Sequence, residues 1–186
     1  MNLPNRLTLF RFVLAGILVV VMLVQPGEFW QTLSFIIFVL AALTDFLDGW
    51  LARRLNMKTD FGALMDPLAD KVLVCAVFIL FVEMGKVASW MAILIVTREL
   101  AVTGLRVLAA SQQVTLAADT GGKIKTILQM AAITLIFIEL IASQKNFQPD
   151  WLGWMTGILL YLSVILTGVS AISYFWRNRS LYLDHS

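Results

Sequence analysis

Four aspartates are spaced in a way that could hold metal ions. Asp45 and Asp48 lie three residues apart at the end of one apolar stretch, and Asp66 and Asp70 lie four apart at the start of the next. On a helix these spacings place the members of each pair on one face. Carboxylates without histidine or cysteine suit Mg²⁺, Mn²⁺ or Ca²⁺. Two such ions would stabilise the charge on a phosphate during its transfer.

Four acidic groups gathered near hydrocarbon need positive charge to offset them. Like charges at close range repel one another, and an ionisable group in a membrane costs about 2.5–3.5 kcal/mol even on the lenient insertion scale. The aspartates could instead be ordinary boundary charges balanced by nearby basic residues, which are Arg53, Arg54, Lys58 and Lys71. Small residues on the same faces favour a bound ligand, because Gly49, Ala52 and Gly62 let it approach the backbone closely.

Composition places the chain in a lipid bilayer. Of its 186 residues, 60% are hydrophobic and 14% are charged, and the mean hydropathy is +0.85, whereas a soluble domain carries about a quarter charged residues. The single Cys75 excludes an internal disulfide and a cysteine-based zinc site. The single histidine, His185, lies beside the C-terminus, which argues against histidine catalysis and a His-ligated metal.

Apolar stretches long enough to span a bilayer, about 20 residues each, occur six times. They cover residues 7–25, 31–52, 66–84, 87–110, 124–143 and 151–176. The first imitates a signal peptide, but no small-x-small cleavage site follows it, so we expect it to be retained as a span. The sequence therefore predicts an all-α, polytopic membrane protein, with residues 1–186 folded as a single six-transmembrane-helix bundle.

Basic residues predict how this bundle is oriented. If the N-terminus is cytoplasmic, ten of the 14 Lys and Arg residues fall on the cytoplasmic side and two on the other, while Arg98 and Arg106 lie within the fourth span. Cytoplasmic loops of membrane proteins carry an excess of positive charge. Both termini and the predicted metal site are therefore expected to face the cytoplasm.

The stretch from Asp45 to Asp70 follows the pattern D-x2-D-G-x2-A-R-x8-G-x3-D-x3-D. At every defined position it resembles the signature of the CDP-alcohol phosphotransferases, a family of six-span membrane enzymes. The resemblance implies that a CDP-linked lipid binds through two divalent cations, Mg²⁺ or Mn²⁺, held by Asp45, Asp48, Asp66 and Asp70. It also implies that Asp70 is the catalytic base, which takes the proton of an acceptor hydroxyl as that hydroxyl attacks the lipid-side phosphorus and CMP leaves.

The same resemblance implies a nucleotide site around the acidic residues. Gly49, Ala52 and Gly62 would admit the nucleotide, and Arg53 would help to neutralise it. Asn5 and Thr8 belong to the opening PNRLTLFR, which resembles the segment leading into the first span of these enzymes.

Basic residues of the fourth and fifth spans indicate an acceptor that itself carries phosphate. They are Arg98, Arg106, Lys123 and Lys125. Glu99 and Arg106 are seven residues apart and share a helical face, a spacing that allows a pair across two turns. Two roles for Arg106 are therefore left open, contact with substrate or a pair with Glu99 alone. The sequence shows no obvious partner for Arg98, and an arginine at depth generally faces a cavity or an anion. The alternative for the basic residues is anchoring at the membrane surface.

The stretches TRELAVTGLR and GGKIKTILQM resemble the branch of the family that makes phosphatidylglycerophosphate in bacteria. The implied reaction transfers the phosphatidyl group from CDP-diacylglycerol to sn-glycerol 3-phosphate and releases CMP. The other acceptors considered are serine, inositol phosphate and phosphatidylglycerol. A homodimer in the bacterial cytoplasmic membrane is expected, in contact with membrane lipids and with no nucleic acid as partner.

Two other functions also use clustered carboxylates. An intramembrane prenyltransferase holds a pyrophosphate with paired acidic motifs and Mg²⁺, but it would need more spans and does not require the Gly-Ala-Arg positions. A divalent-cation channel could use a ring of aspartates at a pore mouth. In this chain the four carboxylates face one side, and Glu28, Glu83 and Asp150 are scattered at the opposite ends. Release of CMP on adding an alcohol would exclude the channel.

Overall fold

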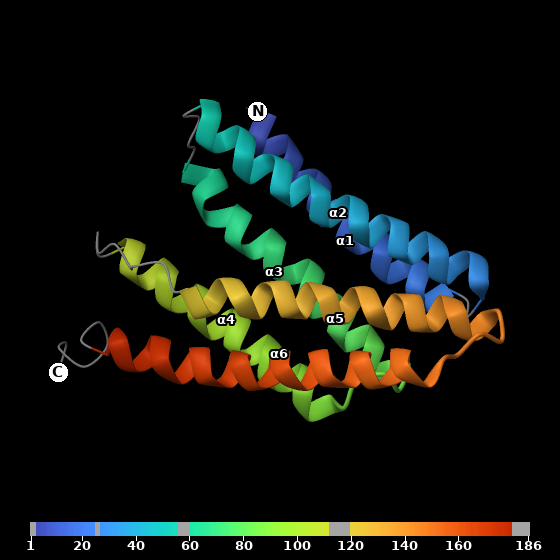
Figure 1. Cartoon of the computed structure of the whole chain (residues 1–186). Helices are drawn as coiled ribbons and strands as arrows, with labels where there is room; N and C mark the ends of the chain where they lie inside the picture. Colours follow the sequence, from blue (N-terminus) through green and yellow to red (C-terminus); the bar gives the residue numbers. More distant parts are fainter. Residues whose placement is uncertain (1–2, 25–26, 56–59, 112–119, 180–186) are drawn as a thin grey trace.

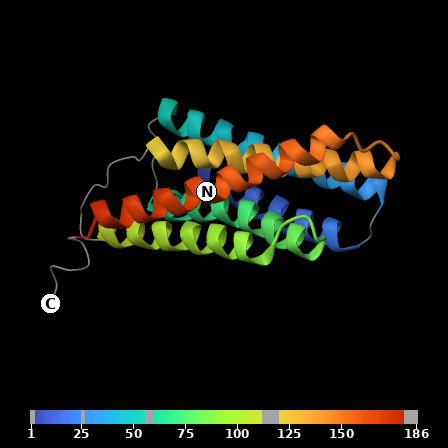
Figure 2. The ribbon, with the colours of Figure 1, turned by 60° about the horizontal axis from the view of Figure 1, so that its bottom comes forward.

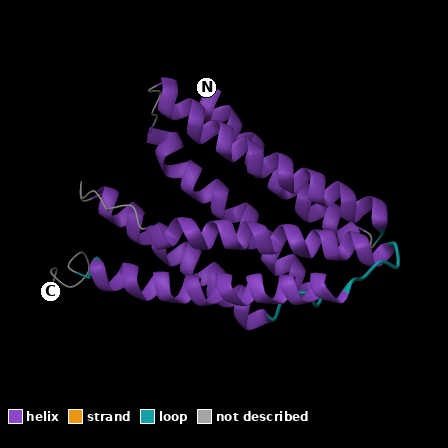
Figure 3. Ribbon diagram, viewed as in Figure 1, coloured by secondary structure: helices purple, strands orange, loops and turns teal. Residues whose placement is uncertain are grey.

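The structure, a computed structural model, describes the backbone of residues 3–24, 27–55, 60–111 and 120–179, and the side chains of residues 9–24, 27–44, 71–109 and 122–179. Within these ranges it is all-helical and contains no strand (Figure 3). The helices are α1 (Leu3–Val24), α2 (Glu28–Leu55), α3 (Asp60–Glu83), α4 (Ser89–Ser111), α5 (Thr120–Gln144) and α6 (Asp150–Arg177). The prediction of an all-α fold is confirmed.

The helices form a bundle in which each one runs antiparallel to its predecessor (Figure 1). Going around the bundle, the order of packed neighbours is α1, α3, α4, α6, α5 and α2, and α3 also touches α5. Because α4 and α6 are separated by one helix in the chain, they run parallel to each other (Figure 2). The starts of α1, α3 and α5 and the ends of α2, α4 and α6 therefore lie toward the same end of the bundle.

Aromatic rings fill the core where α2, α3 and α5 meet. The Phe137 ring is 5.6 Å from Phe35, 5.7 Å from Phe38 and 5.1 Å from Phe81, measured between centroids. Contacts at these distances in tilted and edge-on geometry add attraction to the packing itself. This cluster joins helices that are distant in the sequence.

The turn between α3 and α4 shows why a glycine stands at its start. Gly85 has a φ of 68°, in the left-handed region that favours glycine. Its N–H donates to the carbonyl of Val82, and the N–H of Lys86 donates to that of Phe81. These two bonds close the end of α3 as a Schellman motif and reverse the chain within a few residues.

Two helical segments among the described residues are long and apolar enough to cross a membrane, Gly122–Gln144 and Asp150–Arg177. The described apolar parts of the first two helices are shorter, at Leu9–Val24 and Glu28–Thr44. On α6 the outward face carries Ile158, Ile165 and Ile172, each more than half exposed. An exposed aliphatic face of this kind is suited to lipid contact.

The six predicted apolar stretches correspond one to one to the six helices. The 13-residue connection expected over 53–65 is, however, mostly helical, because α2 continues to Leu55 and α3 begins at Asp60. The helical residues 53–55 and 60–65 are mainly Arg, Leu, Ala and Met, which favour helix. An apolar stretch marks where lipid begins and ends, so it underestimates a helix that continues into the polar region.

Replacing Phe137 with alanine should destabilise the bundle, because it empties the centre of the aromatic cluster. We expect a loss of about 3 kcal/mol, the low end for a buried phenylalanine, since lipid solvates apolar groups better than water does. Thermal unfolding in detergent measures this. Phe147→Ala is the matched control because that ring is 65% exposed. Equal melting temperatures for the two variants would contradict the assignment of Phe137 to the core.

Candidate functional site

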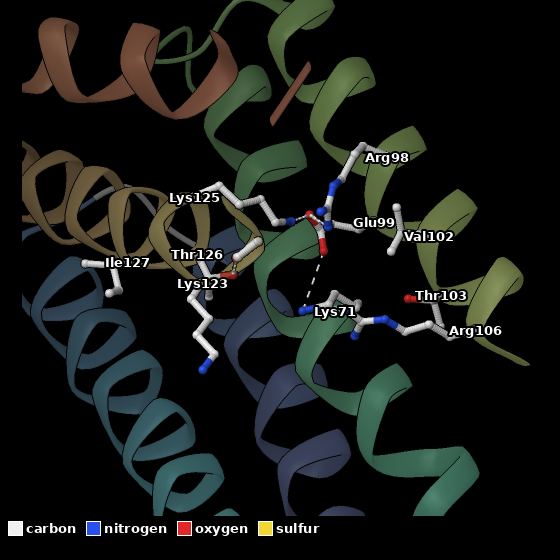
Figure 4. A pocket seen from close by; sticks show the side chains of 11 residues that line it. Lys71, Arg98, Glu99, Val102, Thr103, Arg106, Lys123, Lys125, Thr126 and Ile127 are labelled. Atoms are coloured by element: carbon white, nitrogen blue, oxygen red, sulfur yellow. Dashed lines mark hydrogen bonds and ion pairs between the residues drawn. The ribbon is translucent and has the colours of Figure 1, made fainter. Parts of the chain in front are cut away.

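A basic cavity of about 470 Å³ lies between α3, α4 and α5 (Figure 4). Its lining residues are Lys71 from α3; Arg98, Glu99, Val102, Thr103 and Arg106 from α4; and Gly122, Lys123, Lys125, Thr126 and Ile127 from α5. Among these described lining residues five are cationic and one is anionic. A concentration of charge of this kind in a cleft attracts anions.

Glu99 lies at the centre of the cations, with its side chain only 1% exposed. Its Oε1 is 3.4 Å from Nη1 of Arg98 and also pairs with Nζ of Lys125. Its Oε2 is 3.5 Å from Nζ of Lys71. We call these four residues the Glu99 cluster. Its members come from α3, α4 and α5, so it ties the three walls of the cavity together.

The cluster explains how the cations are tolerated inside the bundle. The side chains of Arg98 and Lys125 are 6% and 2% exposed, and taking such charges out of water is costly unless an opposite charge compensates. One carboxylate shared among three cations compensates part of their charge. The same cations line the cavity, where they would attract an anionic ligand.

Arg106 is held by a different helix. Its Nε donates to Oη of Tyr174 on α6 at 3.4 Å, and its guanidinium carbon lies 5.8 Å from the centroid of that ring. The expected pairing of Arg106 with Glu99 is therefore wrong, because Glu99 is engaged by Lys71, Arg98 and Lys125. Arg98 also has a second polar partner, since its Nη2 donates to Oγ of Ser170 at 3.2 Å.

The structure brings together all four basic residues predicted to bind the acceptor. Arg98 and Arg106 come from α4, and Lys123 and Lys125 from α5, and all of them line the cavity. Thr103 and Thr126 add hydroxyl groups to the same wall. Sequence reasoning did not identify these two threonines, since a threonine in an apolar span is usually bonded within its own helix. Thr126 does donate to the carbonyl of Gly122 at 3.0 Å.

Lys71 is a cavity residue that sequence reasoning assigned elsewhere, as one of the charges balancing the aspartates. The structure places it on the cavity wall and pairs it with Glu99. A carboxylate deep in an apolar helix needs a cation close to it. Glu99 was therefore the feature of the sequence that indicated a cation from a neighbouring helix. The sequence alone does not say which helix that is.

The carboxylates predicted to bind metal and the residues predicted to bind the nucleotide lie in α1, α2 and α3. They are near the end of the bundle where α1 and α3 begin and α2 ends. Asp45 and Asp48 lie in α2, and Asp66 and Asp70 lie in α3, where Lys71 is the next residue. Their side chains fall outside the described residues, as do those of Asn5, Thr8, Gly49, Ala52, Arg53 and Gly62. Among the side chains that are described, no three His, Cys, Asp or Glu residues gather as metal ligands would. The metal site stays a prediction.

Comparison with known proteins places the whole chain beside one group of enzymes. The model of the family described as CDP-alcohol phosphatidyltransferase matches residues 1–169. The chain is 37% identical to the CDP-diacylglycerol–glycerol-3-phosphate 3-phosphatidyltransferase of Bacillus subtilis, over 95% of each chain. It is 35% identical to the protein of that name in Salmonella choleraesuis, over 98% of each. It is 34% identical to the probable phosphatidylglycerophosphate synthase of Mycobacterium tuberculosis, over 95% of this chain and 81% of the relative.

Glu99→Gln should destabilise the protein, because it keeps the side-chain shape and removes the negative charge that offsets the buried cations. Breaking a buried ion pair on one side costs about 3–5 kcal/mol, and we expect a loss near 3 kcal/mol in the free energy of unfolding. Melting in detergent measures it. Glu83→Gln, at an exposed position at the end of α3, is the control and should change little. A Glu99→Gln variant as stable as the native chain would show that the cluster needs no counter-charge.

Proposed function

The chain belongs to the CDP-alcohol phosphatidyltransferase family, and we propose that it transfers the phosphatidyl group from CDP-diacylglycerol to sn-glycerol 3-phosphate, giving phosphatidylglycerophosphate and CMP. The names of its relatives specify these two substrates. The observation that carries the proposal is the basic cavity, which begins one residue after the proposed catalytic base, Asp70.

The charge of the cavity favours an acceptor that carries a phosphate group. Arg98 and Arg106 offer planar guanidinium groups that suit phosphate oxygens, and Lys123 and Lys125 add compact positive charges. Serine has no phosphate group for these cations to bind. Inositol phosphate would satisfy the charge equally well, and the names of the relatives favour glycerol 3-phosphate over it.

The position of the cavity beside α3 supports the proposed chemistry. A glycerol phosphate held by its phosphate in the cavity would direct its free hydroxyl along α3 toward Asp70. We propose that Asp70 takes the hydroxyl proton while the hydroxyl oxygen bonds to the lipid-side phosphorus and the bond to CMP breaks. Holding the two reacting groups side by side contributes much of the acceleration in such reactions.

Asp45, Asp48, Asp66 and Asp70 would hold two divalent cations, Mg²⁺ or Mn²⁺. The donor set fits these ions, because it contains only carboxylates and comes from two helices that pack together, α2 and α3. Bound there, the cations would neutralise the charge of the pyrophosphate. Around them we assign the nucleotide to Gly49, Ala52, Arg53 and Gly62, with Asn5 and Thr8 from α1.

We propose that all six helices cross the bacterial inner membrane and that both termini and the active site face the cytoplasm. The excess of Lys and Arg at one end of the spans and the antiparallel order of the helices support this topology. At the cytoplasmic surface a soluble acceptor and the headgroup of a membrane-bound lipid are both within reach. The proposals of one domain over residues 1–186 and of a homodimer rest on the family resemblance.

The proposed reaction is tested by CMP release from purified protein supplied with CDP-diacylglycerol, Mg²⁺ and one acceptor at a time. We expect turnover with glycerol 3-phosphate, and none with serine, inositol phosphate or phosphatidylglycerol. Asp70→Asn should abolish turnover because the amide accepts no proton. Asp150→Asn, at the opposite end of the bundle, should retain it. Turnover with another of these acceptors alone would overturn the assignment, and an active Asp70→Asn enzyme would overturn the role of that residue.

Arg98→Ala should weaken acceptor binding selectively. The loss of a charge-assisted hydrogen bond of about 1.5–3 kcal/mol corresponds to a rise of about 10- to 100-fold in KM for glycerol 3-phosphate. The KM for CDP-diacylglycerol should change much less, and Arg98→Lys should fall between the two enzymes. Arg179→Ala is the control, because Arg179 lies on the Trp176 ring outside the cavity. Equal rises in both KM values would reject the role given to Arg98.

A further inference from the structure

A stripe of buried polar side chains runs along one face of α6. Ser163, Thr167, Ser170 and Tyr174 are spaced by four, three and four residues, so they share that face. Their exposed fractions lie between 0% and 6%. A hydroxyl group buried in an apolar bundle needs a hydrogen-bond partner, so the partners of the stripe indicate its purpose.

Two residues of the stripe contact the arginines of the cavity. Oγ of Ser170 accepts from Arg98 at 3.2 Å, while the same hydroxyl donates to the carbonyl of Thr167 at 3.2 Å. Oη of Tyr174 accepts from Arg106 at 3.4 Å. Ser170 thus uses its proton within α6 and offers a lone pair to the guanidinium.

A third residue of the stripe contacts α5, the helix that forms another wall of the cavity. Oγ1 of Thr167 accepts from Nε2 of Gln129 on α5 at 3.1 Å, and both side chains are buried. The stripe therefore connects α6 to α4 and to α5, which each supply five of the eleven lining residues. No residue of α6 is among these eleven, so α6 supports the cavity from behind.

Each arginine of α4 has its own partner on α6. Arg98 and Arg106 are eight residues apart, about 12 Å along α4, whereas Ser170 and Tyr174 are four apart, about 6 Å along α6. Because α4 and α6 pack side by side and in parallel, Ser170 and Tyr174 can each meet one of the two arginines. Figure 4 shows both arginine side chains extending from α4 toward the side on which Lys71 and Lys125 lie.

From these contacts we propose that Ser170 and Tyr174 are positioning residues, which hold Arg98 and Arg106 ready for the phosphate of the acceptor. Both arginines have many rotamers, and fixing them before the ligand arrives lowers the entropy lost on binding. The inference rests on the proposed function, since it takes the ligand of the cavity to be a phosphorylated acceptor. It adds a helix and two residues that touch no substrate.

Ser170→Ala and Tyr174→Phe test the proposal, because each removes one hydroxyl and little else. We expect the KM for glycerol 3-phosphate to rise about three- to tenfold in each variant, as for the loss of one modest hydrogen bond to a charged group. The values of kcat and of the KM for CDP-diacylglycerol should stay within about twofold, because positioning of these arginines concerns acceptor binding alone.

Matched controls exist on the same helix. Ser163→Ala removes a buried hydroxyl that bonds only to the carbonyl of Leu160, and Tyr161→Phe removes an exposed one. Neither should alter the KM for the acceptor. A rise in the controls equal to that in Ser170→Ala and Tyr174→Phe would mean that α6 acts through packing in general, and would overturn the proposal.

Double-mutant cycles separate positioning from a general effect on the structure. Ser170→Ala should have no further effect on KM once Arg98 is alanine, and Tyr174→Phe none once Arg106 is alanine. The crossed pairs, Ser170→Ala with Arg106→Ala and Tyr174→Phe with Arg98→Ala, should be close to multiplicative. The proposal is wrong if Ser170→Ala raises KM by the same factor in the Arg98→Ala enzyme as in the native enzyme, and Tyr174→Phe does so in the Arg106→Ala enzyme.

The affinity for inorganic phosphate, measured by calorimetry on the purified protein, tests the inference without the reaction. Ser170→Ala and Tyr174→Phe should weaken phosphate binding, and the controls Ser163→Ala and Tyr161→Phe should leave it unchanged. Native protein that binds phosphate but shows no turnover with glycerol 3-phosphate would overturn the proposed function, and the cycles would then be judged on phosphate affinity. Phosphate affinity unchanged by Ser170→Ala and Tyr174→Phe would overturn the inference.

Discussion

Positive charge inside an apolar bundle has to be offset from within, and among the side chains that the structure describes Glu99 is the carboxylate that meets the cations of the cavity. Its two oxygens meet cations from α3, α4 and α5. The contact holds the three helices together around a cavity whose described lining is mainly cationic among its charged residues. Stability and the charge of the cavity are therefore linked in this protein, because the residues that join the three helices also line the cavity.

Two groups of helices carry the two proposed binding sites. The helices α1, α2 and α3 carry the residues proposed to bind the nucleotide and the metal ions, and α4 and α5 carry most of the cavity proposed for the acceptor. Helix α6 lies behind the cavity, where Ser170 and Tyr174 contact Arg98 and Arg106 of its lining and Thr167 contacts Gln129 of α5. The aromatic cluster around Phe137 joins α2, α3 and α5 and so holds the two groups against each other.

Much of this arrangement could be predicted from the sequence, because lipid permits little besides helices and an apolar stretch marks each one. The convergence of Arg98, Arg106, Lys123 and Lys125 was also predicted, because these basic residues lie in two successive helices. The hydrogen-bond and ion-pair partners of these basic residues could not be predicted from the sequence. Tyr174 lies 68 residues after Arg106, and nothing in the sequence shows that α4 packs beside α6. Spacing along one helix favoured a pairing of Glu99 with Arg106, and packing between helices produced another.

Helix α3 belongs to both halves of the protein through two consecutive residues, Asp70 and Lys71. Neighbours on a helix differ by about 1.5 Å along the axis and by about 100° around it. The backbone of a single turn therefore acts as a rigid ruler between the carboxylate end of α3 and the cationic wall of the cavity. Any tilt or slide of α3 carries Asp70 and Lys71 along together, so the separation of these two residues is set by the covalent chain and does not depend on how loosely the bundle is packed.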